Sequence, residues 1–281
     1  MSIVTLLSDW GLSDYYVAAV KGRLYSECPD LRVIDISHDL PKYDTKAAAF
    51  VLKQTYPHFP AGTVHCIGIN DIATPEQPHI IVYEDNQYFI GADNGLFELL
   101  FDRQPSGAWR ISLQPDGQSA TFPSLNLFPL AAVHIAQGGS PDEIGEPYDW
   151  NGRNISLKVD LPETTALCGK NGQPIGVRLS GKVIYIDSYG NCVTNIPQDL
   201  FEEIRARYPR FQINIQGFNM KGPLLNRISH RYGEVQTADL CALFPDHRLL
   251  EISMNKAKAD KYFALKRSII YIDFLLPVTT V

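Results

Sequence analysis

The chain has 281 residues, enough for one large domain or two medium ones with a substantial hydrophobic core. Lys and Arg number 25 against 31 Asp and Glu, which gives a formal net charge of -6, and no Lys/Arg-rich run occurs. This balance argues against nucleic acid or a membrane surface as a partner. No segment approaches the roughly 20 apolar residues of a membrane span. We expect no signal peptide and a cytoplasmic location.

The cysteines occur singly, at positions 28, 66, 168, 192 and 241. Neither a CxxC pair nor a Cys/His cluster with zinc spacing is present, so no metal site is expected. An odd number of cysteines without framework spacing predicts reduced, mostly buried thiols.

The first half of the chain alternates between strand-like and helix-like segments. Apolar runs predict strands at residues 3–7, 32–37 and 63–69, and apolar periodicity predicts helices at 14–28, 44–56 and 128–139. Asp44 is a plausible N-cap of the second helix. A hairpin is predicted over 79–92, turning at residues 84–86. This alternation predicts an α/β domain with a largely parallel sheet covered on both faces.

The character of the sequence changes after about residue 150. Residues 151–175 are rich in Gly, Pro, Asn and Thr and predict a linker with some extended structure. One short helix is predicted at 197–207, among strand-like segments at 182–187, 211–217, 249–254 and 268–274. We therefore expect an α/β domain over 1–150, a linker over 151–175 and a smaller, mainly-β, barrel-like domain over 176–281.

Two predicted strands of the first half end in polar side chains. Asp9 ends the first strand, and Asn70 and Asp71 end the third. Strand ends in open α/β proteins are where ligand-contacting groups lie. The alternative is that Asp9 is a solvated loop residue and that Ser13 or Asp14 caps the following helix.

A third polar segment, IDSYGNCVTNI (186–196), follows a strand of the second half. It gathers a carboxylate, an aromatic ring, a glycine and amides, with Asp187, Asn191 and Asn195 around Tyr189. Such a set can bond the edge of a nucleoside while the ring stacks on its face. The alternative is a tight turn in which the glycine takes a positive φ and the amides bond the backbone.

Together these segments resemble the S-adenosylmethionine hydroxide adenosyltransferase family, whose relatives include fluorinase and chlorinase enzymes. SDWGLSDYYVAAVKG (8–22) resembles the family's TDFG-x-x-D-x-YV-x-x-x-KG, and VIDISHDLPKYDTKAAAFVL (33–52) resembles its VDI-x-H segment. FPAGTVHCIGIND (59–71), FIGADNGLF (89–97) and 186–196 are similar to its FP-x-GTVH, DNGL and ID-x-FGN-x-x-TNI motifs. Several motifs in the right order are far more specific than any one of them.

The resemblance implies roles for particular residues. Asp9 takes the place of the family carboxylate that holds the ribose hydroxyls of S-adenosylmethionine, since a carboxylate can accept from both hydroxyls. Asp14 is expected near the methionine ammonium. Asp187 and Asn191 match methionine- and nucleoside-contacting positions, and Tyr189 stands where the family has a phenylalanine beside the base.

Three further positions are implied to bind the ligand. Phe122 matches an aromatic near the reacting centre, Asn255 lies in the segment that closes over adenine, and Tyr43 stands where halogenases have a tryptophan. The family forms trimers with each site between the N-terminal domain of one subunit and the C-terminal domain of a neighbour, so a homotrimer is expected. The resemblance implies S-adenosylmethionine as the substrate, and no separate cofactor is expected.

The chain departs from the hydrolase branch of the family, which prepares the attacking water with an Asp, Arg and His set. The matching positions hold Asn70, Gln77 and Pro123. Asn and Gln can bond a water but do not titrate, and proline offers no polar side-chain atom. Ser124 aligns with the serine that holds halide in the halogenase branch, although a helix N-cap also explains it. Asn70, Gln77 and Ser124 are the candidate catalytic positions.

The resemblance predicts an enzyme that hydrolyses S-adenosylmethionine to adenosine and methionine by displacement at ribose C5′. We expect it to be slow, because losing a positioned base removes about 10²–10⁴-fold in rate. The first alternative is a non-catalytic protein that binds S-adenosylmethionine or adenosine. The second is an adenosyltransferase with a halide-type nucleophile.

Overall fold

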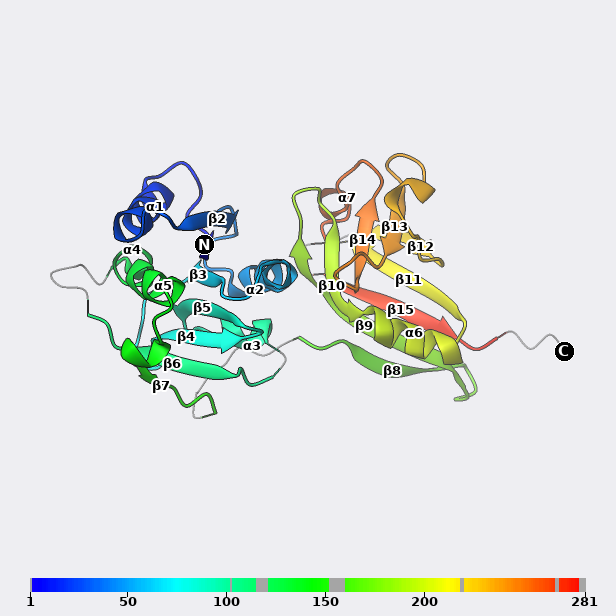
Figure 1. Ribbon diagram of the computed structural model, residues 1–281. Coiled ribbons are helices and arrows are strands. Elements are labelled where there is room, and N and C mark those ends of the chain that lie inside the picture. The colour runs from blue at the N-terminus through cyan, green and yellow to red at the C-terminus, as the bar shows by residue number, and fades with distance from the viewer. Residues whose placement is uncertain are drawn as a thin grey trace. The chain divides into compact units, whose positions relative to one another are not determined.

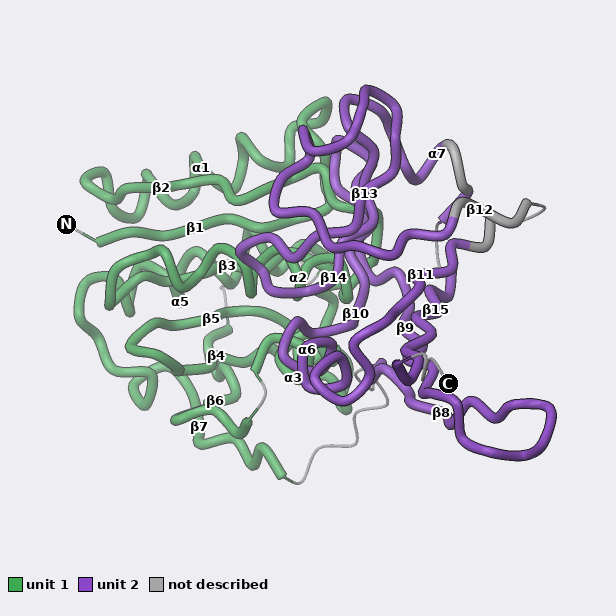
Figure 2. Tube along the Cα trace, turned by 90° about the vertical axis from the view of Figure 1, so that its right-hand side faces the viewer, with its two compact units in different colours: residues 1–159 green, residues 160–281 purple. Residues whose placement is uncertain are grey.

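The computed structural model describes residues 2–101, 103–114, 121–151, 160–217, 220–265 and 268–277. The chain forms two compact units, Met1–Val159 and Asp160–Val281 (Figures 1 and 2). Part of the predicted linker, 152–159, lies outside the described residues. Another part is a strand, β8 (Glu163–Cys168), which pairs with β9 (Pro174–Ile186) of the second unit.

A seven-stranded sheet in the order β2-β1-β3-β5-β4-β6-β7 forms the first unit. Its strands are β1 (Ile3–Ser8), β2 (Arg32–Ser37), β3 (Val64–Gly68), β4 (His79–Glu84), β5 (Gln87–Ala92), β6 (Gly107–Ile111) and β7 (Gly145–Pro147). The pairings β1–β2, β1–β3 and β3–β5 are parallel. The pairings of β4 with β5 and β6, and of β6 with β7, are antiparallel. The α/β class is confirmed, with a mixed sheet whose parallel part is β2-β1-β3-β5.

Helices cover both faces of this sheet (Figure 1). One face carries α1 (Tyr16–Glu27), α4 (Pro123–Asn126) and α5 (Phe128–Ala136), and the other carries α2 (Thr45–Thr55) and α3 (Leu96–Leu100). Short 3-10 helices lie at Tyr56–His58 and Pro141–Glu143. Leu6 packs into the core under α1 and α5, and Leu7 packs into the core under α2 and α3, because successive side chains of a strand point to opposite faces. Asp44 caps α2 as predicted, accepting the N–H of Ala47 at 3.0 Å.

The second unit is an antiparallel sheet in the order β12-β11-β15-β9-β10-β14-β13, with β8 beside β9. Its other strands are β10 (Cys192–Pro197), β11 (Arg210–Gly217), β12 (Met220–Leu225), β13 (Leu240–Leu243), β14 (Leu249–Met254) and β15 (Ile269–Leu275). Because β12 also lies beside β13, the sheet curls towards a closed barrel, as predicted. Helix α6 (Gln198–Arg207) anchors in its core through Phe201, which contacts Phe211 and Phe274.

The remaining helices of the second unit are short. They are α7 (Ala259–Phe263) and a 3-10 turn at Tyr232–Glu234. None of the helices in the described ranges has the length and hydropathy of a membrane span.

All five cysteines are free thiols, and three of them, Cys66, Cys192 and Cys241, are buried. Burial raises the pKa of the Cys66 thiol to about 12. A buried thiol of this kind is inert, because the thiolate is the reactive form.

Candidate functional site

Asp9 lies directly after β1 and is buried, with 6% of its surface exposed. Its Oδ2 accepts the backbone N–H of Tyr43 at 2.6 Å, and its carbonyl oxygen accepts the ammonium of Lys42. The alternative of a solvated loop carboxylate is therefore wrong. Tyr43 itself has a left-handed backbone (φ 60°) and an exposed ring. Asp9 thus ties the end of β1 to the loop before α2.

The start of α1 also differs from the alternative of a capped helix. Tyr15 is the cap residue, and no side-chain hydrogen bond caps the helix. Ser13 and Asp14 are exposed in the preceding loop. Among the described residues, no hydrogen bond holds the Asp14 side chain in the way that the Tyr43 N–H holds Asp9.

An aromatic cluster packs beside Asp9. The ring of Trp10 meets Phe122 edge-on at a centroid distance of 5.3 Å and stacks with His38 at 6.1 Å. Phe122 also meets Tyr16 edge-on at 5.4 Å. The sequence motif contained Trp10, but its contact with Phe122 joins residues far apart in the chain, one after β1 and one just before α4.

At the end of β3 the chain turns sharply. Asn70 is exposed and left-handed (φ 45°), a conformation that Asn tolerates better than most residues. The side-chain N–H groups of Asn94 donate to the carbonyl oxygens of Ile69 at 2.8 Å and Asn70 at 3.1 Å, which holds the turn. The next side chain, Asp71, accepts the hydroxyl of the buried Ser124. Sequence reasoning mapped the family position onto Asn70 and did not select Asp71.

Ser124, Pro123 and Gln77 lie in different local settings. Ser124 is the second residue of α4 and Phe122 is the cap, so the alternative that Ser124 is an N-cap is wrong. Pro123 is buried as the first residue of α4. Gln77 is exposed, and its backbone N–H bonds the hydroxyl and carbonyl oxygens of Thr74, each at 3.1 Å.

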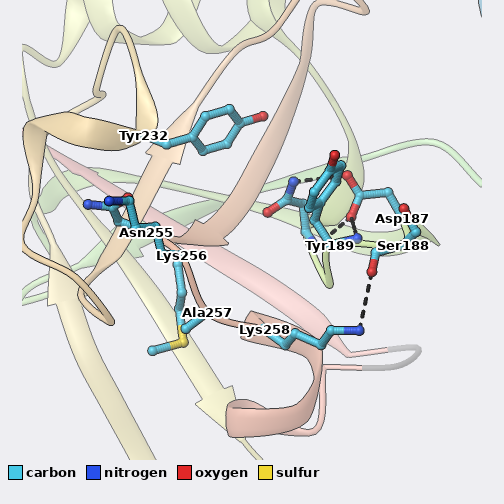
Figure 3. Close-up of a pocket in the computed structure, with 10 residues that line it drawn as sticks. Asp187, Ser188, Tyr189, Tyr232, Asn255, Lys256, Ala257 and Lys258 are labelled. Atoms are coloured by element: carbon cyan, nitrogen blue, oxygen red, sulfur yellow. Dashed lines mark hydrogen bonds between the residues drawn. The ribbon is translucent and has the colours of Figure 1, made fainter.

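The second unit contains a cavity of about 670 Å³ (Figure 3). It is lined by Asp187, Ser188, Tyr189, Asn191, Tyr232, Met254, Asn255, Lys256, Ala257 and Lys258. On one wall, Asp187 Oδ1 accepts the backbone N–H groups of Tyr189 and Asn191, both at 2.9 Å. Its Oδ2 accepts the side-chain N–H of Asn191 at 2.9 Å. The predicted tight turn and the predicted ligand-facing set are therefore the same structure.

Gly190 makes this turn possible. Its φ is 83°, which side-chain-bearing residues rarely adopt. A Cβ there would also lie 2.4 Å from Oδ1 of Asp260 and 2.8 Å from Cβ of Lys258. Lys258 in turn donates to the carbonyl oxygen of Ser188 at 3.2 Å (Figure 3), which joins the two sides of the cavity.

Tyr232 forms another wall of the cavity, with its ring turned inward (Figure 3). Its hydroxyl donates to Oε1 of the buried Glu251 at 3.0 Å. Ser253 donates to the same carboxylate at 2.6 Å, and Nε2 of His247 lies 3.3 Å from it. Burial pushes the pKa of Glu251 up, but these hydrogen bonds outweigh burial and hold the pKa below its usual value. Burial and the Glu251 charge raise the pKa of Tyr232, so its hydroxyl stays a donor.

Two asparagines of the predicted set are occupied by the backbone. Asn255 lines the cavity, while its side-chain N–H donates to the carbonyl oxygen of Val235 at 2.8 Å. Asn195 accepts the N–H of Lys182 at 2.7 Å and donates to the carbonyl oxygen of Asp160 at 2.6 Å. Asn195 therefore shapes the strands rather than facing the cavity.

The structure thus gathers the predicted residues in two places. In the first unit, Asp9, Phe122, Asn70 and Ser124 lie at the carboxyl ends of the parallel strands and on α4, whereas Asp14 and Gln77 are exposed on loops. In the second unit, one cavity brings together Asp187, Tyr189, Asn191 and Asn255, and Asn195 is not among its lining residues. Within the described ranges, no three His, Cys, Asp or Glu side chains gather closely enough to hold a metal.

These features define the class of protein. The chain has an α/β unit with a buried carboxylate at its strand ends, followed by a β unit whose cavity is lined by tyrosines and amides. It is a two-domain protein whose polar and aromatic side chains gather at the ends of parallel strands and in a cavity of the β unit, the places where such folds bind small molecules. The chain belongs to the SAM hydroxide adenosyltransferase family. The family's N-terminal domain matches residues 4–145, and its C-terminal domain matches residues 181–269.

Individual relatives agree with this assignment. The chain is 27% identical to a (R)-S-adenosyl-L-methionine hydrolase of Thermus thermophilus, over 95% of this chain and 97% of the relative. It is 37% identical to a fluorinase of Nocardia brasiliensis, over 76% and 78% of the two chains. A crystal structure of an uncharacterized conserved protein from Thermotoga maritima has the same fold, with a TM-score of 0.78, 23% identity and coverage of 96% and 99%.

Proposed function

We propose that this protein is an S-adenosyl-L-methionine hydrolase that forms adenosine and methionine. The observation that supports it most is the nearly full-length match to a relative named (R)-S-adenosyl-L-methionine hydrolase. Asp9 and the Asp187–Asn191 turn add support, because both are held by hydrogen bonds in the manner a polar ligand site needs.

Asp9 would bind the ribose. Its Oδ2 is used by the Tyr43 N–H, and among the described residues no hydrogen bond reaches Oδ1. That oxygen is available for a ribose hydroxyl, in a buried setting where a charge-assisted bond is strong. The rings of Tyr189 and Tyr232 offer flat faces for the base.

The reaction needs no general acid for the leaving group. Displacement at C5′ turns a sulfonium into a neutral thioether, so the leaving methionine needs no proton. The attacking water must be placed opposite the sulfur, and competing water must be excluded. It must also lose a proton, because hydroxide is scarce at neutral pH.

The test is incubation of the purified protein with S-adenosyl-L-methionine, with and without chloride, and chromatography of the nucleosides. We expect adenosine and methionine in equal amounts. Calorimetric binding of S-adenosyl-L-methionine without any adenosine would instead favour a non-catalytic binding protein, in line with the replacement of the family's Asp, Arg and His set by Asn70, Gln77 and Pro123. A 5′-chlorinated nucleoside would favour a halide nucleophile.

The proposal includes a homotrimer with sites shared between subunits, which the family resemblance implies, and a cytoplasmic location, which was expected from the sequence pattern. Light scattering checks the oligomer directly. A stable monomer with full affinity for adenosine would contradict the trimer.

The turn at Asp187 provides a prediction on binding. Asp187→Ala removes the three hydrogen bonds that hold the turn, so the ligand must order the turn as it binds, and adenosine affinity should fall about 10-fold. Asp187→Asn keeps an oxygen for the two backbone N–H groups and should lose less. Calorimetry with adenosine measures both variants. Equal affinity of Asp187→Ala and the wild type would remove this turn from the site.

A further inference from the structure

The replaced family set leaves open which group takes the proton from the attacking water. Asp71 offers a carboxylate at the end of β3, where its neighbour Asn70 occupies the family's position. The left-handed backbone of Asn70 points that side chain to solvent, and Asp71 turns back onto Ser124. Compared with the family motif, the carboxylate stands one residue later in this chain, and it lies at the same edge of the sheet.

This contact lies beside Asp9. Ser8 of β1 pairs with Gly68 of β3 in parallel register, so the residues after both strands leave the sheet at one edge. Neighbouring strands are about 4.8 Å apart. The packing over Gly68 is close, since a Cβ there would lie 2.3 Å from the Trp10 ring and 2.9 Å from Oγ of Ser124. Trp10 and Ser124 thus meet over one strand end, next to the expected ribose carboxylate.

Asp71 is held from a second side. Nε2 of His79 lies 2.7 Å from the carbonyl oxygen of Asp71 and therefore carries the proton of that hydrogen bond. The His79 ring packs edge-on against Phe128 of α5 at 5.2 Å. The backbone of Asp71 is thus anchored to β4, while its carboxylate stays at an intermediate, partly accessible position.

We infer that Asp71 is the base for water in the proposed hydrolysis, with Ser124 as its positioning residue, and that the pair selects water over halide. The inference rests on the proposed function. Water oxygen forms a bond to C5′ as one of its protons passes to Asp71. The C5′–S bond breaks with its electron pair on sulfur, giving neutral methionine sulfur and adenosine, and Asp71 then releases the proton to solvent.

The selection against halide follows from the same contact. Ser124 donates its hydroxyl hydrogen bond to Asp71, so its oxygen offers only lone pairs to a nucleophile. Lone pairs and a carboxylate accept hydrogen bonds from water, whereas they repel an anion. A halide would need the donor that Ser124 no longer offers.

The experiment compares Asp71→Asn with the wild type and with Asp30→Asn. Asparagine can still accept the Ser124 hydroxyl but cannot take a proton, so kcat for adenosine formation should fall about 100-fold or more. Affinity for S-adenosyl-L-methionine, measured by calorimetry, should stay within about threefold. Asp30 is an exposed acidic residue between α1 and β2, and its variant removes the same charge while keeping the wild-type rate. Ser124→Ala should lower kcat less than Asp71→Asn.

A second variant guards against a folding defect. In Asp71→Ala, added formate should restore part of the lost rate, because a small carboxylate can occupy the vacated space and accept the proton. Wild-type kcat in Asp71→Asn, or no rescue of a folded Asp71→Ala, would overturn the inference and leave hydrolysis standing. A halogenated nucleoside from the wild type in excess chloride would overturn the selection of water. A wild type that binds substrate but forms no adenosine would overturn both the inference and the proposed function.

Discussion

Lowering the pH from 7 to about 4 is expected to cost the first unit about 3 kcal/mol of stability through one side chain, His65. His65 is fully buried in β3. Its Nε2 lies 2.7 Å from Oε1 of Gln87, which can only accept, and its Nδ1 lies 2.7 Å from the hydroxyl of Thr5. These partners define a neutral ring that donates from Nε2 and accepts at Nδ1.

The sign follows from the two protonation states. Burial lowers the pKa of His65 from 6.5 to about 4, although the bond to Gln87 opposes the shift. Between these values the unfolded chain binds a proton that the folded chain does not, so acid favours unfolding. The contribution is complete above about pH 6.5 and falls by about 1.4 kcal/mol for each pH unit down to about 4.

Urea unfolding followed by tryptophan fluorescence measures the pH dependence of stability in the first unit. All three tryptophans, Trp10, Trp109 and Trp150, lie within the first unit. His65→Gln should show a shallower pH dependence than the wild type. Ile67→Val, a buried change on the same strand, should lose about 1 kcal/mol at every pH and keep the wild-type slope. Equal slopes in the wild type and His65→Gln would contradict the prediction.

Local signals in the sequence predicted the elements well. The hairpin of β4 and β5 turns at Asp85 and Asn86, both with positive φ, and such residues are the ones that tolerate that backbone. The antiparallel pairing of β4 with β6 joins residues as far apart as Ile80 and Arg110, so this extension of the sheet beyond the hairpin had no local signal. The strand β8 is mostly exposed and lacks alternation, which explains why its segment resembled a linker.

The candidate site was predicted where its parts are close in sequence. The Asp187 turn is one short segment of the chain. Its residue types therefore predicted both the turn and a polar wall for a ligand site. Tyr232 also lines this cavity, and its hydroxyl bonds Glu251 on β14, a contact that no sequence spacing reveals. The choice between Asn70 and Asp71 depended on one backbone angle at Asn70, and alignment carries no information on that angle.

Asp9→Ala is expected to weaken binding of adenosine and of S-adenosyl-L-methionine by about 1.5–3 kcal/mol, or roughly 10- to 150-fold, the usual worth of hydrogen bonds to a charged group. The reason is that Asp9 is buried and already fixed by the Tyr43 N–H, so its free oxygen needs no reorganisation to accept a ribose hydroxyl. Calorimetry on the folded variant measures the loss. Tryptophan fluorescence, to which the neighbouring Trp10 contributes, reports whether the first unit is folded.

Asp9→Asn separates the two roles of this side chain. Its amide oxygen can still accept the Tyr43 N–H and hold the loop, but its NH2 group is a donor and cannot accept a hydrogen bond from a ribose hydroxyl. We therefore expect Asp9→Asn to keep the wild-type stability and still lose most of the affinity. Asp39→Asn, an exposed acidic residue after β2, controls for the loss of one charge and should bind normally. Wild-type affinity in Asp9→Asn would show that the carboxylate holds only the loop, and the ribose would then have to be bound by other groups.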